Sequence, residues 1–106
     1  MKILFVCTQG KNRSRTASGV WKKLHPEDEV LSIGSEYFDE KHQPQIMEIL
    51  DWADRIYAME ERHKKEIISI SRGYERIYVK IKVLGIPDLY DYNNPELVRI
   101  LKTKLK

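Results

Sequence analysis

Hydrophobic residues in this chain follow two patterns. In some segments they are consecutive, and in others they recur every three to four positions. The run at residues 2–6, rich in β-branched and aromatic side chains, predicts a strand buried in a parallel sheet, and residues 29–33 and 55–59 are predicted to form two further short strands. The repeats predict amphipathic helices, at residues 14–25, 44–52, 60–71 and 95–105. Because runs and repeats take turns along the chain, the pattern predicts successive strand–helix units.

One stretch, residues 74–82, fits both patterns. Ile77 and Val79 lie two positions apart, as on one face of a strand, whereas Tyr74 and Ile77 lie three apart, as on one face of a helix. Because β-branched residues dominate, we expect strand character that leads into a fourth strand at residues 83–86.

The predicted order β-α-β-α-β-α-β-α indicates an α/β fold with a four-stranded parallel sheet, helices on both faces and right-handed connections. A chain of 106 residues is long enough for one hydrophobic core and too short for two, so we expect a single domain over residues 1–106. Ligands of such sheets bind beyond the carboxyl ends of the strands. Residues that directly follow the first and fourth strands are therefore candidates for one site.

Composition narrows the function classes. Hydrophobic residues make up 42% of the chain, and no apolar run approaches the roughly 18 residues of a membrane span. The first residues enter a strand without a signal-peptide pattern, so we expect a cytoplasmic protein that contacts no membrane. The net charge of +3 comes with no nucleic-acid-binding motif, and we expect no nucleic-acid partner. The three histidines lack the spacing of a metal site, and we expect no metal or organic cofactor; His63 is expected to be structural.

The candidate chemistry lies in residues 7–14, between the first strand and the first helix. A loop in this place presents free backbone N–H groups and the positive end of the helix dipole, which together bind phosphate. The same field and the guanidinium of Arg13 favour the thiolate form of Cys7. Cys7 is the only cysteine, so it forms no internal disulfide and needs reducing surroundings to stay active.

Cys7, five intervening residues, Arg13 and Ser14 resemble the C-x5-R-S signature of the low-molecular-weight protein tyrosine phosphatases. Three further segments resemble the family's second strand, the stretch entering its third strand, and its Asp-Pro-Tyr segment, at residues 31–35, 53–59 and 86–90. Residues 86–97 are also similar to a short microbial branch that is predicted to consist of tyrosine phosphatases. The resemblance implies a phosphotyrosine phosphatase I-like fold, a three-layer sandwich with strand order 2-1-3-4.

The loop residues have distinct expected roles. Cys7 attacks phosphorus and forms a phosphocysteine intermediate, while Arg13 holds two phosphoryl oxygens as charge spreads. Ser14 donates its hydroxyl to the thiolate, and would equally suit the N-cap of the first helix. The expected phosphate-binding residues, acting mainly through backbone N–H groups, are Thr8, Gln9, Gly10, Lys11, Asn12, Arg13 and Ser14.

Asp88 is the candidate general acid, because protonation of a leaving phenolate needs a carboxyl on a loop that faces the nucleophile. Asp91, three residues further on, is its rival. Tyr90 and Tyr92 are candidates to flank an aromatic substrate, although packing explains either side chain equally well. The expected partner is therefore a phosphotyrosine protein or a small aryl phosphate.

Three positions depart from the family pattern. Gly10 stands where the family usually has Asn, Arg15 where it commonly has Pro, and Leu89 where it has the Pro of Asp-Pro. Glycine tolerates a left-handed backbone, so the shape of the loop can persist without the Asn side chain. Because Leu89 replaces that proline, the rigidity of the loop that carries the acid is not carried over from the family.

Other functions share parts of this pattern. An arsenate reductase begins with the same Cys-x5-Arg loop, and with one cysteine only a version resolved by an external thiol fits. A phosphocarrier resembling the small sugar-transport IIB proteins also has a cysteine after its first strand, but it lacks the counterparts of Arg13 and Asp88. A non-catalytic phosphate-binding or phosphopeptide-binding module is a further alternative. The leading prediction is a cysteine-dependent phosphomonoester hydrolase of the protein tyrosine phosphatase type.

Overall fold

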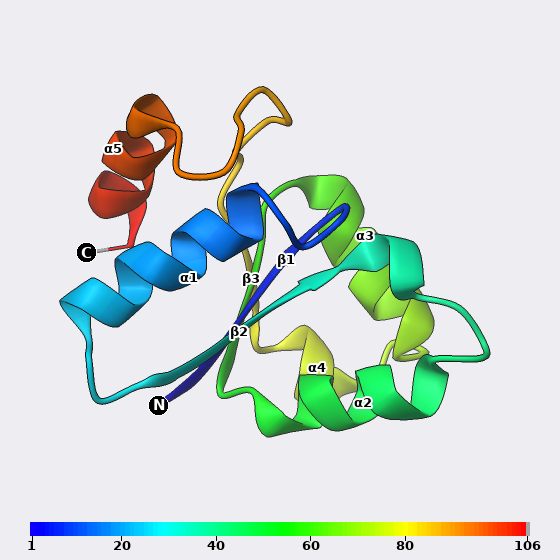
Figure 1. Cartoon of the computed structure of the whole chain (residues 1–106). Helices are drawn as coiled ribbons and strands as arrows, with labels where there is room; N and C mark the ends of the chain where they lie inside the picture. Colours follow the sequence, from blue (N-terminus) through cyan, green and yellow to red (C-terminus); the bar gives the residue numbers. More distant parts are fainter. Residues whose placement is uncertain (106) are drawn as a thin grey trace.

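The computed structural model describes residues 1–105 and contains a four-stranded parallel sheet between two layers of helices (Figure 1). The strands are β1 (Lys2–Cys7), β2 (Glu29–Gly34), β3 (Arg55–Ala58) and β4 (Ile81–Val83). They lie in the order β2-β1-β3-β4, and every neighbouring pair is parallel. The predicted strand order and the three-layer α/β arrangement are confirmed.

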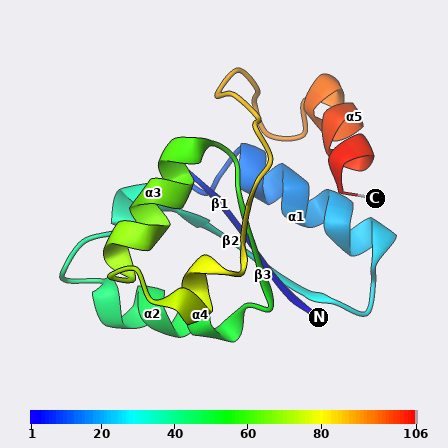
Figure 2. The ribbon, with the colours of Figure 1, turned by 180° about the vertical axis from the view of Figure 1, so that it is seen from behind.

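Helices cover both faces of the sheet. They are α1 (Arg13–Leu24), the 3-10 turn η1 (Ser35–Tyr37), α2 (Gln43–Trp52), α3 (Glu61–Ile70), α4 (Glu75–Tyr78) and α5 (Pro95–Lys104). Helices α1 and α5 pack on one face, while α2, α3 and α4 pack on the other, as Figure 1 and the reverse view in Figure 2 show. In the part of the chain that the structure describes, no helix combines the length and the apolar character needed to cross a bilayer.

Strand β1 lies at the centre of both cores. Ile3, Phe5 and Cys7 point to the face covered by α1 and α5, whereas Leu4 and Val6 point to the face covered by α2, α3 and α4. All five side chains are buried. Burial on both faces explains why this strand is an unbroken apolar run, and it places Cys7 at the end of the best-buried strand.

The prediction for residues 74–86 is wrong in part. Residues 75–78 form the short helix α4, and β4 begins only at Ile81. Burial does not follow the alternation of a strand here, because Ile77 is fully buried while Val79 is 68% exposed. Beyond β4, two further backbone hydrogen bonds, one to β3 and one to the residue after it, hold the chain beside β3 as far as Ile86. The fourth strand therefore starts earlier than predicted, and its extension leads to Asp88.

Candidate active site

The loop of residues 8–12 connects β1 to α1 and closes over the sulfur of Cys7. The N–H of Gly10 donates to Cys7 Sγ at 3.2 Å, and the hydroxyl oxygen of Ser14 lies 3.0 Å from the same sulfur. Only 3% of Cys7 is exposed. The sulfur thus lies at a helix N-terminus, within hydrogen-bond distance of one backbone N–H and one hydroxyl group.

Ser14 is not the N-cap of the first helix. Helix α1 begins at Arg13, its N-cap is Asn12, and the Asn12 side chain makes no capping hydrogen bond to the described residues. Ser14 lies in the first turn instead, with its hydroxyl directed at Cys7. Without a side-chain cap, the first N–H groups of α1 are available to an anion.

Two glycines allow the loop to rest directly on the end of β2. Gly10 has the left-handed backbone expected of it, with φ +74°. A Cβ at Gly10 would lie 2.7 Å from the backbone nitrogen of Gly34, and a Cβ at Gly34 would lie 2.5 Å from the carbonyl carbon of Gln9. Both distances are too short for a side chain, so glycine is needed at both positions for this packing.

Arg13 is fixed by acceptors from two other segments. Its Nη1 donates to Glu60 Oε2 at 2.5 Å and to the carbonyl oxygen of Ile86 at 2.8 Å. Its Nε lies 3.8 Å from Asp88 Oδ1. Among residues 1–105 the hydrogen bonds of the guanidinium all use Nη1, so Nη2 and Nε keep donors for a ligand.

Glu60 is a site residue that the sequence pattern did not reveal. Burial acts to raise the pKa of this carboxyl, but hydrogen bonds from Arg13 and Arg62 outweigh burial and lower the pKa, which keeps the carboxylate charged. One signal for Glu60 was available: β1 and β3 are neighbours in register, so the residues that follow them meet at one end of the sheet.

His63 lies behind the loop and has no exposed surface. Its Nδ1 accepts the backbone N–H of Glu60 at 3.1 Å, and its Nε2 lies 3.1 Å from Thr8 Oγ1. Burial is the main cause of a lowered pKa for His63, and the positive charges of Arg13 and Arg62 lower it further. The ring is therefore neutral at pH 7.

A cavity of about 140 Å³ opens in front of Cys7. Its walls come from two distant parts of the sequence, and the residues are Cys7, Thr8, Gln9, Asn12, Arg13 and Asp88. Larger surface hollows occur elsewhere, such as one of about 400 Å³ beside α2 and α3, but that hollow contains neither a thiol nor a buried arginine.

The remaining predicted residues lie around this cavity rather than in its walls. Gly10 and Ser14 contact the sulfur of Cys7, as described above, and Lys11 is exposed. Tyr90 packs against the core beside α1 and α5. Asp91, the rival of Asp88, is not among the described residues that line the cavity. The structure thus brings Asp88 and Cys7 together and leaves Asp91 outside.

Asp88 lies on the loop that joins β4 to α5, with 62% of its side chain exposed. Arg13 binds this loop before the aspartate, through the carbonyl oxygen of Ile86. After the aspartate, the N–H of Asn93 donates to Thr16 Oγ1 in α1 at 2.9 Å. The loop is therefore anchored on both sides of Asp88.

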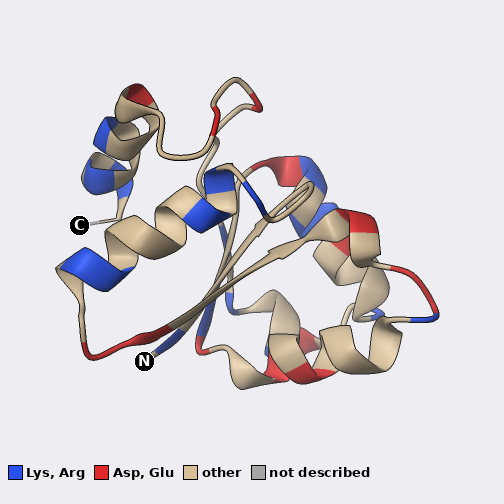
Figure 3. Ribbon diagram, viewed as in Figure 1, with Lys and Arg blue, Asp and Glu red and all other residues tan. Residues whose placement is uncertain are grey.

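Arg15 contributes to the same anchoring. Its guanidinium lies 5.1 Å from the centre of the Tyr92 ring, within the range of a cation–π contact. Figure 3 shows Lys and Arg at both ends of α1, including the end that bears the 8–12 loop. Arg15, which departs from the family pattern, thus links α1 to the loop that carries Asp88 and adds positive charge near the cavity.

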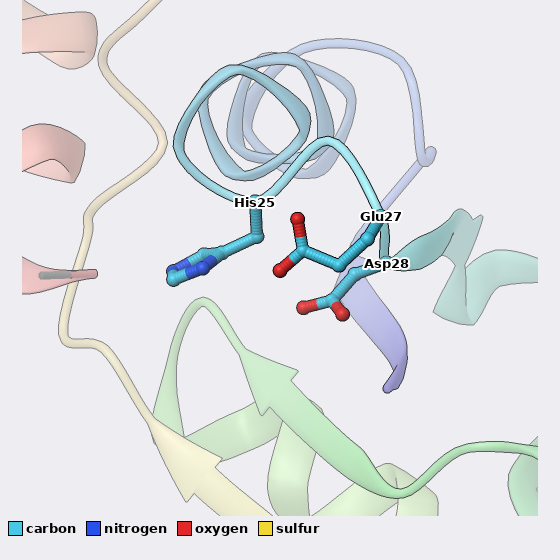
Figure 4. Close-up of side chains that lie close together, drawn as sticks. All are labelled: His25, Glu27 and Asp28. Atoms are coloured by element: carbon cyan, nitrogen blue, oxygen red, sulfur yellow. The ribbon is translucent and has the colours of Figure 1, made fainter.

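A second polar cluster, formed by His25, Glu27 and Asp28, lies where α1 leads into β2 (Figure 4). Each offers a potential metal-ligand atom, and these atoms lie within 4.8 Å of one another. Asp28 accepts from the N-terminal ammonium at 2.7 Å and from Trp21 Nε1 at 3.0 Å, and these bonds lower the pKa of Asp28. Both carboxylate oxygens are therefore occupied: one holds the residue before β1 and the other holds α1, at the opposite end of β1 from Cys7.

Comparison with known proteins identifies structural but not sequence relatives. No protein-family model matches the chain, and no curated protein matches its sequence. The low-molecular-weight protein tyrosine phosphatase SP-PTP from Streptococcus pyogenes superposes with a TM-score of 0.75 at 17% identity, covering 97% of this chain and 87% of that one. A low-molecular-weight protein tyrosine phosphatase from Bacillus subtilis gives 0.67 at 25% identity, covering 99% and 94%.

A third solved structure is the arginine phosphatase YwlE, in a mutant form with a phosphorylated active-site serine. It superposes with a TM-score of 0.67 at 21% identity, covering 99% of this chain and 93% of that one. The matches span nearly the full length of each protein. They confirm the resemblance predicted from the sequence: the chain has the fold of the low-molecular-weight protein tyrosine phosphatases.

Proposed function

We propose that this protein is a cysteine-dependent phosphomonoester hydrolase that acts on phosphotyrosine or a similar aryl phosphate. The observation that carries the proposal is the cavity shared by Cys7, Arg13 and Asp88, because it combines a nucleophile, an anion-binding fork and a proton donor. The proposal agrees with the fold, which is that of known phosphatases.

In the first step, the phosphoryl group binds to the N–H groups of the 8–12 loop and to Arg13. The sulfur of Cys7 attacks phosphorus, so that a P–S bond forms as the P–O bond to the leaving group breaks. Asp88 donates its proton to the departing phenolate oxygen. The product of this step is a phosphocysteine and a free phenol.

In the second step, the Asp88 carboxylate takes a proton from water, and the water oxygen attacks phosphorus. The P–S bond breaks, and the thiolate of Cys7 leaves with a hydrogen bond from Ser14. Arg13 stabilises the charge on the equatorial oxygens in both steps, and its two fixed acceptors keep it oriented before the substrate arrives.

The size of the cavity supports a phosphate-centred site. A cavity of about 140 Å³ is small, which suits a phosphoryl group and leaves the organic part outside. We assign phosphate binding to Thr8, Gln9, Gly10, Lys11, Asn12, Arg13 and Ser14, and propose that Tyr90 flanks the aromatic ring at the rim. Because the single thiol requires reducing surroundings, we propose that the protein acts in the cytoplasm. We also propose that residues 1–106 act as a single domain.

Hydrolysis of p-nitrophenyl phosphate tests the proposal. We expect the wild-type protein to release p-nitrophenol, Cys7→Ser to abolish turnover, and Asp88→Ala to reduce it by about 100-fold or more. Absence of Cys7-dependent turnover would contradict the proposal. Parallel assays with arsenate plus an external thiol, and with phosphotyrosine and phosphoarginine peptides, separate a reductase from a hydrolase and determine which phosphorylated side chain is preferred.

A further inference from the structure

His63 connects the start of α3 to the 8–12 loop through both of its ring nitrogens. The backbone N–H of Glu60 donates to Nδ1 at 3.1 Å, and Nε2 lies 3.1 Å from the hydroxyl oxygen of Thr8. The ring has no exposed surface. Its protein partners therefore determine which nitrogen carries the proton.

The hydrogen bond from Glu60 fixes the tautomer of His63. Nδ1 accepts, so its lone pair is in use, and a neutral ring must then carry its proton on Nε2. Nε2–H donates to Thr8 Oγ1. The hydroxyl of Thr8 thus receives a hydrogen bond and keeps its own proton to give away.

The hydroxyl proton of Thr8 remains available to a ligand. Within residues 1–105 the only hydrogen bond of the Thr8 hydroxyl is the one to His63, and Thr8 lines the cavity in front of Cys7. Thr8 and Arg13 both line this cavity, in which the phosphoryl oxygens would lie. A donor oriented in advance stabilises developing negative charge without a cost of reorganisation.

On this geometry, and resting on the proposed function, we propose that His63 is a positioning residue that makes the Thr8 hydroxyl a donor to the bound phosphoryl group. The start of α3 then controls two sides of the site. The Glu60 side chain holds Arg13, and the Glu60 backbone holds His63 and through it Thr8. Burial and the positive charges of Arg13 and Arg62 lower the pKa of His63, which preserves the neutral ring that this arrangement requires.

A simpler role for His63 is to cap α3. Glu60 and His63 occupy the N-cap and N3 positions of α3 and form a reciprocal capping box, with the His63 ring accepting the N-cap N–H. Two amide side chains separate the roles. Asn places its oxygen near the position of Nδ1 and retains the cap, whereas Gln places its amide nitrogen near the position of Nε2 and retains the donor to Thr8.

The experiment compares Thr8→Val, His63→Asn, His63→Gln and the double variant Thr8→Val/His63→Asn with the wild-type protein. The two readouts are kcat/KM for p-nitrophenyl phosphate and the affinity for inorganic phosphate, followed by the chemical shifts of the loop amides. We expect Thr8→Val and His63→Asn each to lower both quantities by about 10-fold, which is typical for loss of one hydrogen bond to a charged group. The double variant should be no weaker than Thr8→Val alone, and His63→Gln should lose much less than His63→Asn.

A greater loss of activity and phosphate affinity in His63→Gln than in His63→Asn would overturn the proposal and leave His63 as a cap. Losses in the double variant that equal the sum of those in Thr8→Val and His63→Asn would do the same. Phosphate binding that is equal in all variants would overturn it as well. Phosphate binding distinguishes this inference from the proposed function. A wild-type protein that binds phosphate through Thr8 but lacks turnover supports the inference and refutes the enzyme, whereas one that binds no phosphate refutes both.

Discussion

Arg13 carries a full positive charge while only 1% of its surface is exposed. Burial of a charge is costly unless the charge is paired, and removal of one partner leaves the other uncompensated. Glu60 is the nearer of two charged partners of Arg13, Asp88 being the other, and the carbonyl of Ile86 accepts a further hydrogen bond. The orientation of the guanidinium therefore depends on a carboxylate outside the 8–12 loop.

Glu60→Gln tests this dependence. We expect kcat/KM for p-nitrophenyl phosphate to fall by at least about 10-fold, because a charged hydrogen bond contributes about 1.5–3 kcal/mol. Glu61→Gln is the matched control, since Glu61 is the next residue and is exposed. Equal activities in the two variants would show that Arg13 needs no carboxylate partner.

Asp88 and Asp91 provide a second pair of matched positions. Asp88→Asn removes the proton donor and should lower kcat by about 100-fold or more. The loss should be greater with phenyl phosphate than with p-nitrophenyl phosphate, because phenolate is the poorer leaving group. Asp91→Asn should leave both rates close to those of the wild-type protein, and a comparable loss in that variant would reassign the acid.

The 8–12 loop and strand β2 depend on each other through contact between backbones. Gly34 ends β2 directly beside Gln9, and even a methyl group at position 34 would have to push the loop away. The shape of the anion site therefore depends on a strand that contributes no side chain to the cavity walls.

Gly34→Ala should disrupt the loop, and Gly19→Ala serves as its control. We expect Gly34→Ala to reduce phosphate affinity and turnover by at least about 10-fold, since a Cβ at 2.5 Å forces the loop to shift. Gly19 lies in α1 with no atom near its Cβ position, so Gly19→Ala should stabilise the protein by about 0.5–1 kcal/mol in urea unfolding. Undiminished phosphate affinity in Gly34→Ala would contradict the proposed packing.

The strands and longer helices could be predicted because their burial follows simple spacings. Strand β1 is buried on both faces and α5 on one, and each leaves that pattern in the sequence. The short helix α4 could not be predicted, because a single buried residue, Ile77, defines its inner face and β-branched neighbours favour a strand.

The site, like the fold, could be predicted only in part from the sequence. Cys7, Arg13 and Ser14 lie within one short motif, and the resemblance supplied Asp88. The contacts of Arg13 with Glu60 and with the Ile86 carbonyl join residues 47 and 73 positions apart, and only the fold reveals them. Every residue has a backbone carbonyl, so the residue type at position 86 gives no indication that its carbonyl binds Arg13.

The cavity is assembled from the carboxyl ends of parallel strands, so it exists only while the sheet is intact. Two groups that support it, His63 and Glu60, have different pKa values in the folded and unfolded chains. Burial, with help from Arg13 and Arg62, lowers the pKa of His63 below its usual 6.5, and hydrogen bonds from the same arginines lower the pKa of Glu60 below 4.5 against the effect of burial. At either group the unfolded chain takes up a proton at a higher pH than the folded chain does.

Stability should therefore be complete above about pH 6.5 and decline as the pH falls toward the folded-state pKa values. Urea unfolding at about pH 7.5, 6 and 5 measures this decline. His63→Gln should flatten the part between about pH 6.5 and 5, because Gln does not titrate there. Wild-type stability that rises over this interval, or an equal decline in the variant, would contradict the assignment to His63.

Mass analysis of protein that is quenched in acid during turnover tests the phosphocysteine mechanism most directly. With p-nitrophenyl phosphate present, we expect the peptide containing Cys7 to gain the mass of one phosphoryl group. Cys7→Ala should show neither this adduct nor turnover. Turnover that persists in Cys7→Ala, or a phosphoryl group found on any residue other than Cys7 in the wild-type protein, would contradict the account.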